Sequence, residues 1–178
     1  VFVEYAKAAP DDVLIRISVC NRGPEAAALD VLPTLWFRNT WSWTGGGARP
    51  ELVALKNTSF PVMHAHHTDP LFQESLDDYF LYCQGAASLL FTENDTNHKR
   101  LSGGQNASPY VKDGINNFLL HGQTAAVNPA QQGTKAAAHY PVQVAAGGTQ
   151  VIQLRLTRRA PEVIARARGI RARKGSAT

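Results

Sequence analysis

The alternation of residues 12–21 is the feature that most constrains the fold. Positions 13, 15, 17 and 19 are Val or Ile, whereas Arg16 and Ser18 occupy positions between them. A period of two predicts a strand that buries one face. Arg22-Gly-Pro-Glu25 then breaks this run.

Other β-rich runs follow, each bounded by a turn signal. They cover residues 1–9, 29–37, 77–84, 86–91, 138–141 and 150–156, with short pieces between residues 51 and 72. Pro33 interrupts the second run, which predicts an edge strand or a bulge. Gln84-Gly85 predicts a hairpin between its two flanking runs. Because no helices alternate with these strands, we predict an all-β, antiparallel β-sandwich with long loops.

The chain of 178 residues is long enough for one domain with a real core, which we place at residues 1–157. Residues 158–178 form a basic tail, helical or disordered, in which Pro161 and the apolar spacing of residues 160–169 predict a short C-terminal helix. From Arg155 onward there are eight basic residues and one acidic, whereas residues 1–154 carry ten basic and thirteen acidic. The basic excess therefore lies at the end of the chain, and we expect no nucleic-acid partner.

The chain has no apolar run of the roughly 18 residues that a membrane span needs, and it opens without a signal peptide. We therefore expect no membrane partner and a cytoplasmic location. Cys20 and Cys83 lie inside apolar runs, which favours buried free thiols over a disulfide. Because Val1 stands inside a strand-like run without an initiator Met, we expect a fragment of a longer protein.

Residues 92–138 show little periodicity and are rich in Asn, Asp and Gly, and so long a loop region is usually functional. Glycoside hydrolysis needs two carboxyl groups about 5–9.5 Å apart. Glu93, Asp95 and Asp113 are the candidates. Loop carboxylates with Asn and Thr neighbours more often form local hydrogen bonds, so we favour that role and assign no catalytic residue.

Trp36, Trp41 and Trp43, with Arg38 and Asn39 between them, form the densest aromatic cluster in the chain. Flat rings and nearby polar groups suit the apolar faces and hydroxyl rims of sugars. The competing interpretation is that these rings fill the core or pack against a neighbouring domain.

His64 and His66 would project from the same side of a strand, as two metal ligands could. The sequence offers no third ligand at a diagnostic spacing. We therefore expect neither a metal site nor a cofactor.

Four segments carry a family resemblance: residues 35–43 (LWFRNTWSW), 90–97 (LFTENDTN), 108–116 (SPYVKDGIN) and 133–140 (GTKAAAHY). They resemble the N-terminal β-sandwich domain of bacterial glycosidases related to glycoside hydrolase family 63, the mannosyl-oligosaccharide glucosidase group. The resemblance runs from about Val1 to Leu156 and implies a sandwich of the supersandwich type. It also implies a parent enzyme that hydrolyses α-glucosidic bonds with an inverting acid and base pair, both carried by an (α/α) toroid domain that is not part of this chain. The Arg-rich ending after Leu156 departs from the family's continuation into helices.

In such enzymes the sandwich packs on the toroid, and its loops edge the substrate pocket. The residues expected to contact an oligosaccharide or the toroid are Trp36, Arg38, Asn39, Trp41, Trp43, Glu93, Asn97, Tyr110, Lys112 and Asp113. Three functions remain, in this order: a catalytically silent accessory domain with a bare apolar patch, a stand-alone carbohydrate-binding module, and a structural domain that forms a homodimer through that patch.

Overall fold

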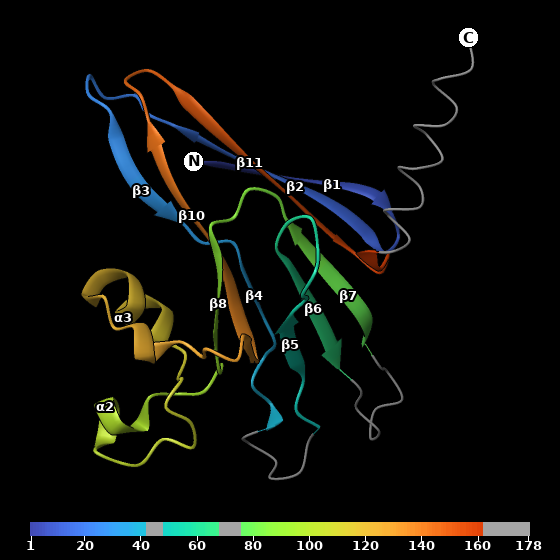
Figure 1. Cartoon of the computed structure of the whole chain (residues 1–178), viewed down its shortest axis with the longest axis vertical. Coiled ribbons are helices and arrows are strands. Elements are labelled where there is room, and N and C mark those ends of the chain that lie inside the picture. The colour runs from blue at the N-terminus through green and yellow to red at the C-terminus, as the bar shows by residue number, and fades with distance from the viewer. Residues whose placement is uncertain (42–47, 68–75, 162–178) are drawn as a thin grey trace.

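Two antiparallel sheets, of seven and four strands, form a β-sandwich in the computed structural model, which describes residues 1–41, 48–67 and 76–161 (Figure 1). In spatial order, the large sheet contains β1 (Phe2–Ala9), β2 (Asp12–Cys20), β11 (Thr149–Thr157), β7 (Leu76–Cys83), β6 (Val62–His67), β5 (Glu51–Ala54) and β9 (Gln132–Gly133). The small sheet contains β3 (Ala27–Val31), β4 (Thr34–Trp36), β8 (Ser88–Thr92) and β10 (Lys135–Val144). The all-β, antiparallel prediction is therefore confirmed.

The long strand β10 organises the small sheet. Its first half pairs with β8 on one side and β4 on the other, and its second half pairs with β3. β3 and β4 therefore follow one edge of β10, and the break between them falls at Pro33, whose carbonyl accepts a hydrogen bond from Ala138 N. This is the interrupted edge strand that Pro33 predicts, since proline has no N–H to donate to a sheet.

The main core lies between the two sheets. Alternate side chains of β2, β11, β7 and β6 meet those of β8 and β10. The most deeply buried include Leu52, Met63, Cys83, Phe91, Ala136 and Ala138. Ile17 and Val19 belong to this core, as the alternation of residues 12–21 predicts.

Each sheet also has apolar side chains on its outer face. α3 (Gly114–His121) covers the small sheet, with Ile115 against Leu90 and Ala137. Val62, Phe80 and Tyr82 form a smaller cluster outside the large sheet. A short helix, α2 (His98–Ser102), and a 3-10 turn, η1 (Thr124–Ala126), complete this side of the molecule. Within the described residues, none of the helices is both long and apolar enough for a membrane crossing.

The predicted hairpin at Gln84-Gly85 is wrong. The turn exists, with Gly85 at a φ of 78°, but β7 pairs with β6 and β11 while β8 pairs with β10. The chain therefore crosses from one sheet to the other at this turn. Both edges of β7 are already occupied, so no edge remains for β8.

The long loop region holds more regular structure than predicted. α2, α3, η1 and β9 lie within residues 92–138, and β10 begins at Lys135 rather than at Ala138. Ile115, Phe118 and Leu119 have the i, i+3, i+4 spacing of a helix, and Gly122 ends α3 in the left-handed conformation. These signals could have located α3 from the sequence.

Both cysteines are free. Cys83 is buried between the sheets, and this burial raises the pKa of its thiol to about 12. Cys20 is half-buried. Trp43 and nearly all of the basic tail lie outside the described residues, so the predicted C-terminal helix does as well.

Candidate functional site

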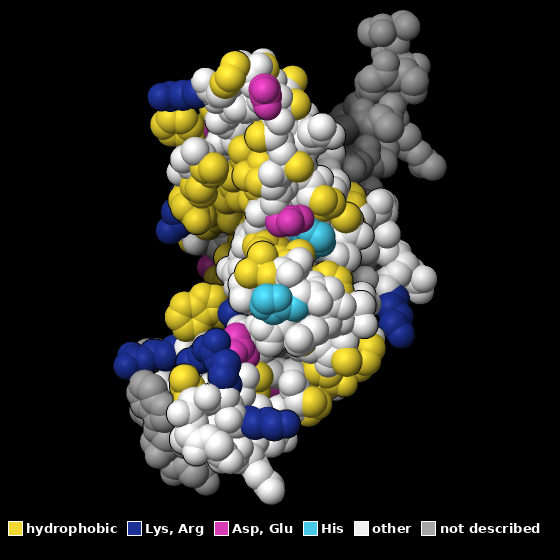
Figure 2. All heavy atoms as spheres, turned by 90° about the vertical axis from the view of Figure 1, so that its left-hand side faces the viewer, with side chains coloured by type: hydrophobic (Ala, Val, Ile, Leu, Met, Phe, Trp, Pro, Cys, Tyr) yellow, Lys and Arg dark blue, Asp and Glu magenta, His cyan; other side chains and the backbone are white. Residues whose placement is uncertain are grey.

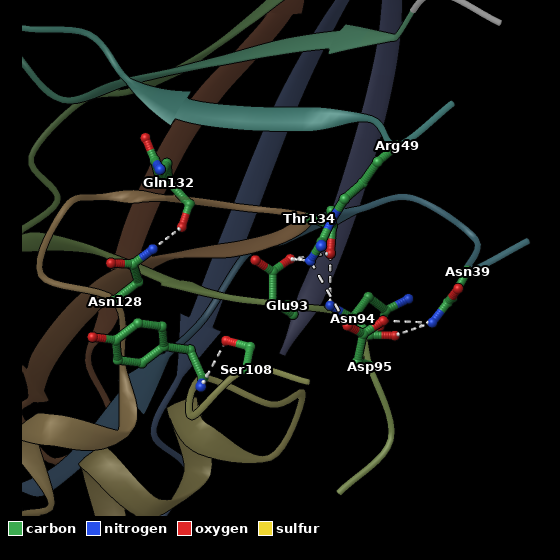
Figure 3. A network of polar contacts seen from close by, with 10 residues as sticks. Asn39, Arg49, Glu93, Asn94, Asp95, Ser108, Asn128, Gln132 and Thr134 are labelled. Atoms are coloured by element: carbon green, nitrogen blue, oxygen red, sulfur yellow. Dashed lines mark hydrogen bonds and ion pairs between the residues drawn. The ribbon is translucent and has the colours of Figure 1, made fainter. Parts of the chain in front are cut away.

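A cleft of about 430 Å³, lined mainly by polar residues, lies where the chain leaves β4 and β8. Figure 3 shows the polar contacts of Asn39, Arg49, Asn94 and Asp95, which belong to this lining. The cleft draws on the two segments that the sequence singled out, residues 36–43 and 92–114. Its lining consists of Asn39, Trp41, Arg49, Asn94, Asp95, Thr96, His98, Ala107 and Lys112. Side chains far apart in the sequence therefore share one surface.

Arg49, in the lining of the cleft, links the carboxylates of Glu93 and Asp95. Its Nη2 lies 2.6 Å from Glu93 Oε2 and 3.7 Å from Asp95 Oδ2. Thr134 Oγ1 donates a hydrogen bond of 2.8 Å to the same Glu93 oxygen. The sequence interpretation missed both Arg49 and Thr134. A lone basic residue two positions after the Gly45-Gly-Gly47 run was the available signal for Arg49.

Two asparagines join residues 36–41, which carry the tryptophans, to the segment that follows β8. Asn39 Nδ2 donates to Asp95 Oδ1 at 2.7 Å and to the Asn94 carbonyl at 3.1 Å. In return, Asn94 Nδ2 donates to the Phe37 carbonyl at 2.8 Å. Figure 3 shows Asn39 and Asp95 pointing toward each other across this junction.

Close backbone contact at Gly133 completes the junction. A Cβ atom at this position would lie 2.3 Å from the Thr92 carbonyl oxygen, so only glycine fits. The next residue, Thr134, donates its backbone N–H to that carbonyl and its hydroxyl to Glu93. The junction is thus built by two of the segments on which the family resemblance rests, residues 90–97 and 133–140.

Asp113 anchors the other side of the loop region. Asn97 Nδ2 lies 3.1 and 3.2 Å from its two carboxylate oxygens, and Arg100 Nε lies 3.3 Å from one of them. Asn97 also caps α2 by accepting a hydrogen bond from Arg100 N. The predicted residues Asn97 and Asp113 therefore fix α2 to the start of α3.

Tyr110 and Lys112 lie on a segment that runs beside residues 93–96. Glu93 N donates to the Tyr110 carbonyl at 2.7 Å, and Lys112 N donates to the Asp95 carbonyl at 3.0 Å. Lys112 Nζ reaches Thr96 Oγ1 at 3.2 Å. Next to it, burial lowers the pKa of Lys135, with a smaller contribution from the charge of Lys112.

The aromatic cluster divides between surface and cleft. Trp36 is 56% exposed on β4, and Trp41 is half-buried in the lining of the cleft. Arg38 is exposed between them. Neither described tryptophan belongs to the buried core.

The arrangement is suited to hydrogen bonding. Glu93, Asp95 and Asp113 each have a cationic partner and at least one amide or hydroxyl partner within the loops. Around them, one aromatic ring and several amide, hydroxyl and ammonium groups line a concave surface. Such a surface matches a ligand with many hydroxyl groups.

His64 and His66 lie on β6 of the large sheet and do not line this cleft. Both contact Asp78 of β7. This shared contact shows that they project from the same side of the strand, as the sequence predicts. The sequence interpretation missed Asp78, which has no recognisable spacing to the two histidines.

Comparison with known proteins relates this chain to part of a longer protein. The chain matches none of the protein-family models. It is 29% identical over 160 residues to a protein of Saccharomyces cerevisiae described as uncharacterized protein YMR196W. The similar region covers 79% of this chain but 15% of the yeast protein. The chain is therefore similar to one segment of a much longer protein.

Proposed function

We propose that this chain is a non-catalytic β-sandwich domain of a larger glycoside hydrolase, related to the α-glucosidases of family 63. In this proposal its polar cleft edges the active site of an (α/α) toroid domain. The observation that carries the proposal is the meeting of residues 36–41 with residues 93–97 in one concave surface, through the hydrogen bonds of Asn39. The yeast relative supports the proposal that this chain is a domain of a larger protein, because a similar segment occurs there within a much longer protein.

The surface around the cleft supports contact with sugar or with the edge of another domain. Figure 2 shows the side that carries β3 and α3, where Lys and Arg side chains gather at the lower end, at the height of α2 in Figure 1. Trp36, at 56% exposure, adds a flat apolar ring to the strand that leads into the cleft. Donor groups beside flat rings are the combination that sugar recognition uses.

A second feature supports a partner domain. Tyr5 and Leu14, both exposed, line a groove of about 530 Å³ with Phe60 and Tyr82 on the large sheet. Apolar side chains at the edge of a sheet are covered in most stable proteins. We assign to this groove the apolar patch that the accessory-domain proposal requires.

The test compares hydrolysis of aryl α-glucosides and α-linked glucose disaccharides by two proteins, the 178-residue chain and a longer protein that contains it. We expect turnover by the longer protein alone. Trp41→Ala in that protein should raise KM several-fold, because a stacking ring in the cleft is lost. Val151→Ala, at an exposed position on β11, is the control and should change neither kcat nor KM.

Turnover by the 178-residue chain would contradict a silent domain and return attention to Glu93, Asp95 and Asp113. Absence of turnover by both proteins would contradict the glycosidase assignment.

A stand-alone carbohydrate-binding module is the second candidate, favoured by the presence of Trp41 in a cleft that this chain forms alone. Calorimetric titration of the 178-residue chain with gluco-oligosaccharides separates the two. Saturable binding that Trp41→Ala removes would favour the binding module, and no binding would favour the accessory domain.

A further inference from the structure

We propose that His64, His66 and Asp78 form a binding site for a Zn²⁺-type divalent ion on the outer face of the large sheet. His64 Nε2 lies 2.7 Å and His66 Nδ1 lies 2.9 Å from the same oxygen, Asp78 Oδ1. The three potential ligand atoms lie within 4.8 Å of one another. Two imidazole nitrogens and one carboxylate oxygen converge on a single point.

The sheet itself creates this convergence. His64 and His66 are two residues apart on β6, so they share a face. Opposite them, the pairing of β6 with β7 shifts by one residue between Ala65↔Tyr79 and His67↔Leu76, which places an extra β7 residue opposite His66. Such a bulge re-aims the side chains beside it. Asp78 lies at this shift and reaches both histidines.

One ring is held in place before any ion binds. The His64 ring stacks on Phe80, with ring centroids 4.9 Å apart and an angle of 10° between the planes. This contact fixes the direction of its Nε2. His66 and Asp78 are exposed and His64 is half-buried, so an ion can enter from solvent.

The donor set favours a particular class of ion. Imidazole nitrogens bind Zn²⁺ and its neighbours in the first transition row, whereas Mg²⁺ and Ca²⁺ prefer oxygen donors. With metal–ligand distances of about 2.1 Å, tetrahedral ligand atoms are about 3.4 Å apart. Small side-chain rotations of His66 and Asp78 would achieve this spacing.

Three protein ligands leave the fourth position of a tetrahedral ion open. Catalytic and exchangeable zinc sites have this arrangement, with water in the open position. Glu51 pairs directly with His66 across β5 and β6, so its side chain starts from the same face of the sheet. Glu51 is therefore a candidate for a further ligand or for a hydrogen bond to bound water.

The competing interpretation is a carboxylate that accepts hydrogen bonds from two histidines and binds no ion. The chain contains a matched control, because His139 Nε2 lies 2.6 Å from Asp30 Oδ1 in the small sheet without a second histidine. A histidine and carboxylate pair alone should not hold Zn²⁺ tightly. The control therefore separates a three-ligand site from a simple pair.

The experiment is calorimetric titration of the tag-free, metal-stripped 178-residue chain with Zn²⁺ at pH 7.5. We expect one ion per chain, no saturable binding of Mg²⁺, and a rise in Tm with Zn²⁺ that EDTA reverses. Asp78→Asn and His66→Gln should each weaken binding at least ten-fold. His139→Gln should leave the Kd unchanged, and so should Cys20→Ser, which removes the half-buried thiol as a competing ligand.

Circular dichroism of each variant reports folding separately from binding. With Co²⁺ in place of Zn²⁺, visible absorption bands typical of four or five ligands should appear in the wild-type chain and be absent in Asp78→Asn. Absence of stoichiometric binding, or binding that survives both Asp78→Asn and His66→Gln, would overturn the proposal.

Discussion

At the residue scale, the partly buried ion pair between Asp12 and Arg155 ties β2 to β11. Arg155 Nε donates to Asp12 Oδ1 at 2.7 Å, and its Nη2 contacts the other oxygen. The hydrogen bond from Arg155 is the main reason that the pKa of Asp12 is lowered. Arg155 opens the basic end of the sequence, yet here it has a structural role within a strand.

Asp12→Asn should lower the free energy of unfolding by about 2 kcal/mol at pH 7, because it leaves the Arg155 charge without its carboxylate. The folded pKa of Asp12 lies below the unfolded value of about 4, so the pair stabilises the protein above pH 4. This stabilisation is lost as the pH falls through the folded pKa. Urea unfolding at pH 7 and at pH 3 should therefore show a difference between wild type and variant that shrinks in acid.

The exposed pair of Arg16 and Glu4, 3.9 Å apart, provides the control for this prediction. Glu4→Gln should leave the urea midpoint nearly unchanged, because exposed ion pairs contribute little. An equal loss of stability in both variants would show that net charge, rather than the pair of Asp12 and Arg155, is responsible.

At the element scale, α2 depends on polar contacts alone. None of its residues is buried, and Asn97 provides its N-cap, its link to Asp113 and an acceptor for Asn106 Nδ2. The helix is also only five residues long, too short to be stable by itself. Asn97 therefore makes several of the polar contacts that hold α2, together with the ion pair between Arg100 and Asp113.

Asn97→Ala should increase hydrogen exchange of the amides of residues 98–106 at least ten-fold, while β10 keeps its protection. Exchange followed by mass spectrometry measures both regions at once. Ser102→Ala is the control, since Ser102 only donates to the His98 carbonyl within α2. Unchanged exchange in Asn97→Ala would show that α2 is held by other contacts.

Individual elements were largely predictable, and the reasons for the failures are local. The period-two pattern of residues 12–21 predicted β2 because one face is buried and the other is not. The start of β10 has no such pattern, because Ala136, Ala137 and Ala138 are all buried, between α3 on one side and the core on the other. A strand covered on both faces has no alternation to detect. α3 was missed because its apolar residues are mostly the short run Phe118-Leu-Leu120, which hides the helical spacing of Ile115, Phe118 and Leu119.

The candidate site was predictable in part for a related reason. The density of Asn, Asp and Trp pointed to Asn39, Glu93 and Asp95, and the fold brings these residues together. Arg49, Thr134 and Asp78 come from distant strands and loops, so only the pairing of strands reveals them. The turn at Gly85 was misinterpreted for the same reason. The sequence of two strands around a turn does not reveal whether they pair in one sheet or lie in two facing sheets.

At the scale of the whole molecule, β1 is the most exposed part of the sandwich. It pairs with β2 alone among the described strands, and Phe2, Val3 and Tyr5 are exposed along its eight residues. Open apolar edges pair with other chains unless they are covered. If the accessory domain is expressed without its partner domain, a second copy of the chain can pair with the open edge of β1.

We therefore expect the 178-residue chain to self-associate with rising concentration in analytical ultracentrifugation, and Tyr5→Lys to weaken this association at least five-fold. Tyr5 is 71% exposed on β1, and a lysine at this edge opposes strand pairing by charge repulsion and hydration. Leu120→Lys is the matched control, because Leu120 is 69% exposed but lies on α3. Equal weakening by both substitutions would locate the contact elsewhere, and a monomer at every concentration would contradict association through β1. In the accessory-domain proposal, the other domains of the longer protein cover β1. A longer protein that does not self-associate would therefore support β1 as the edge that contacts those domains.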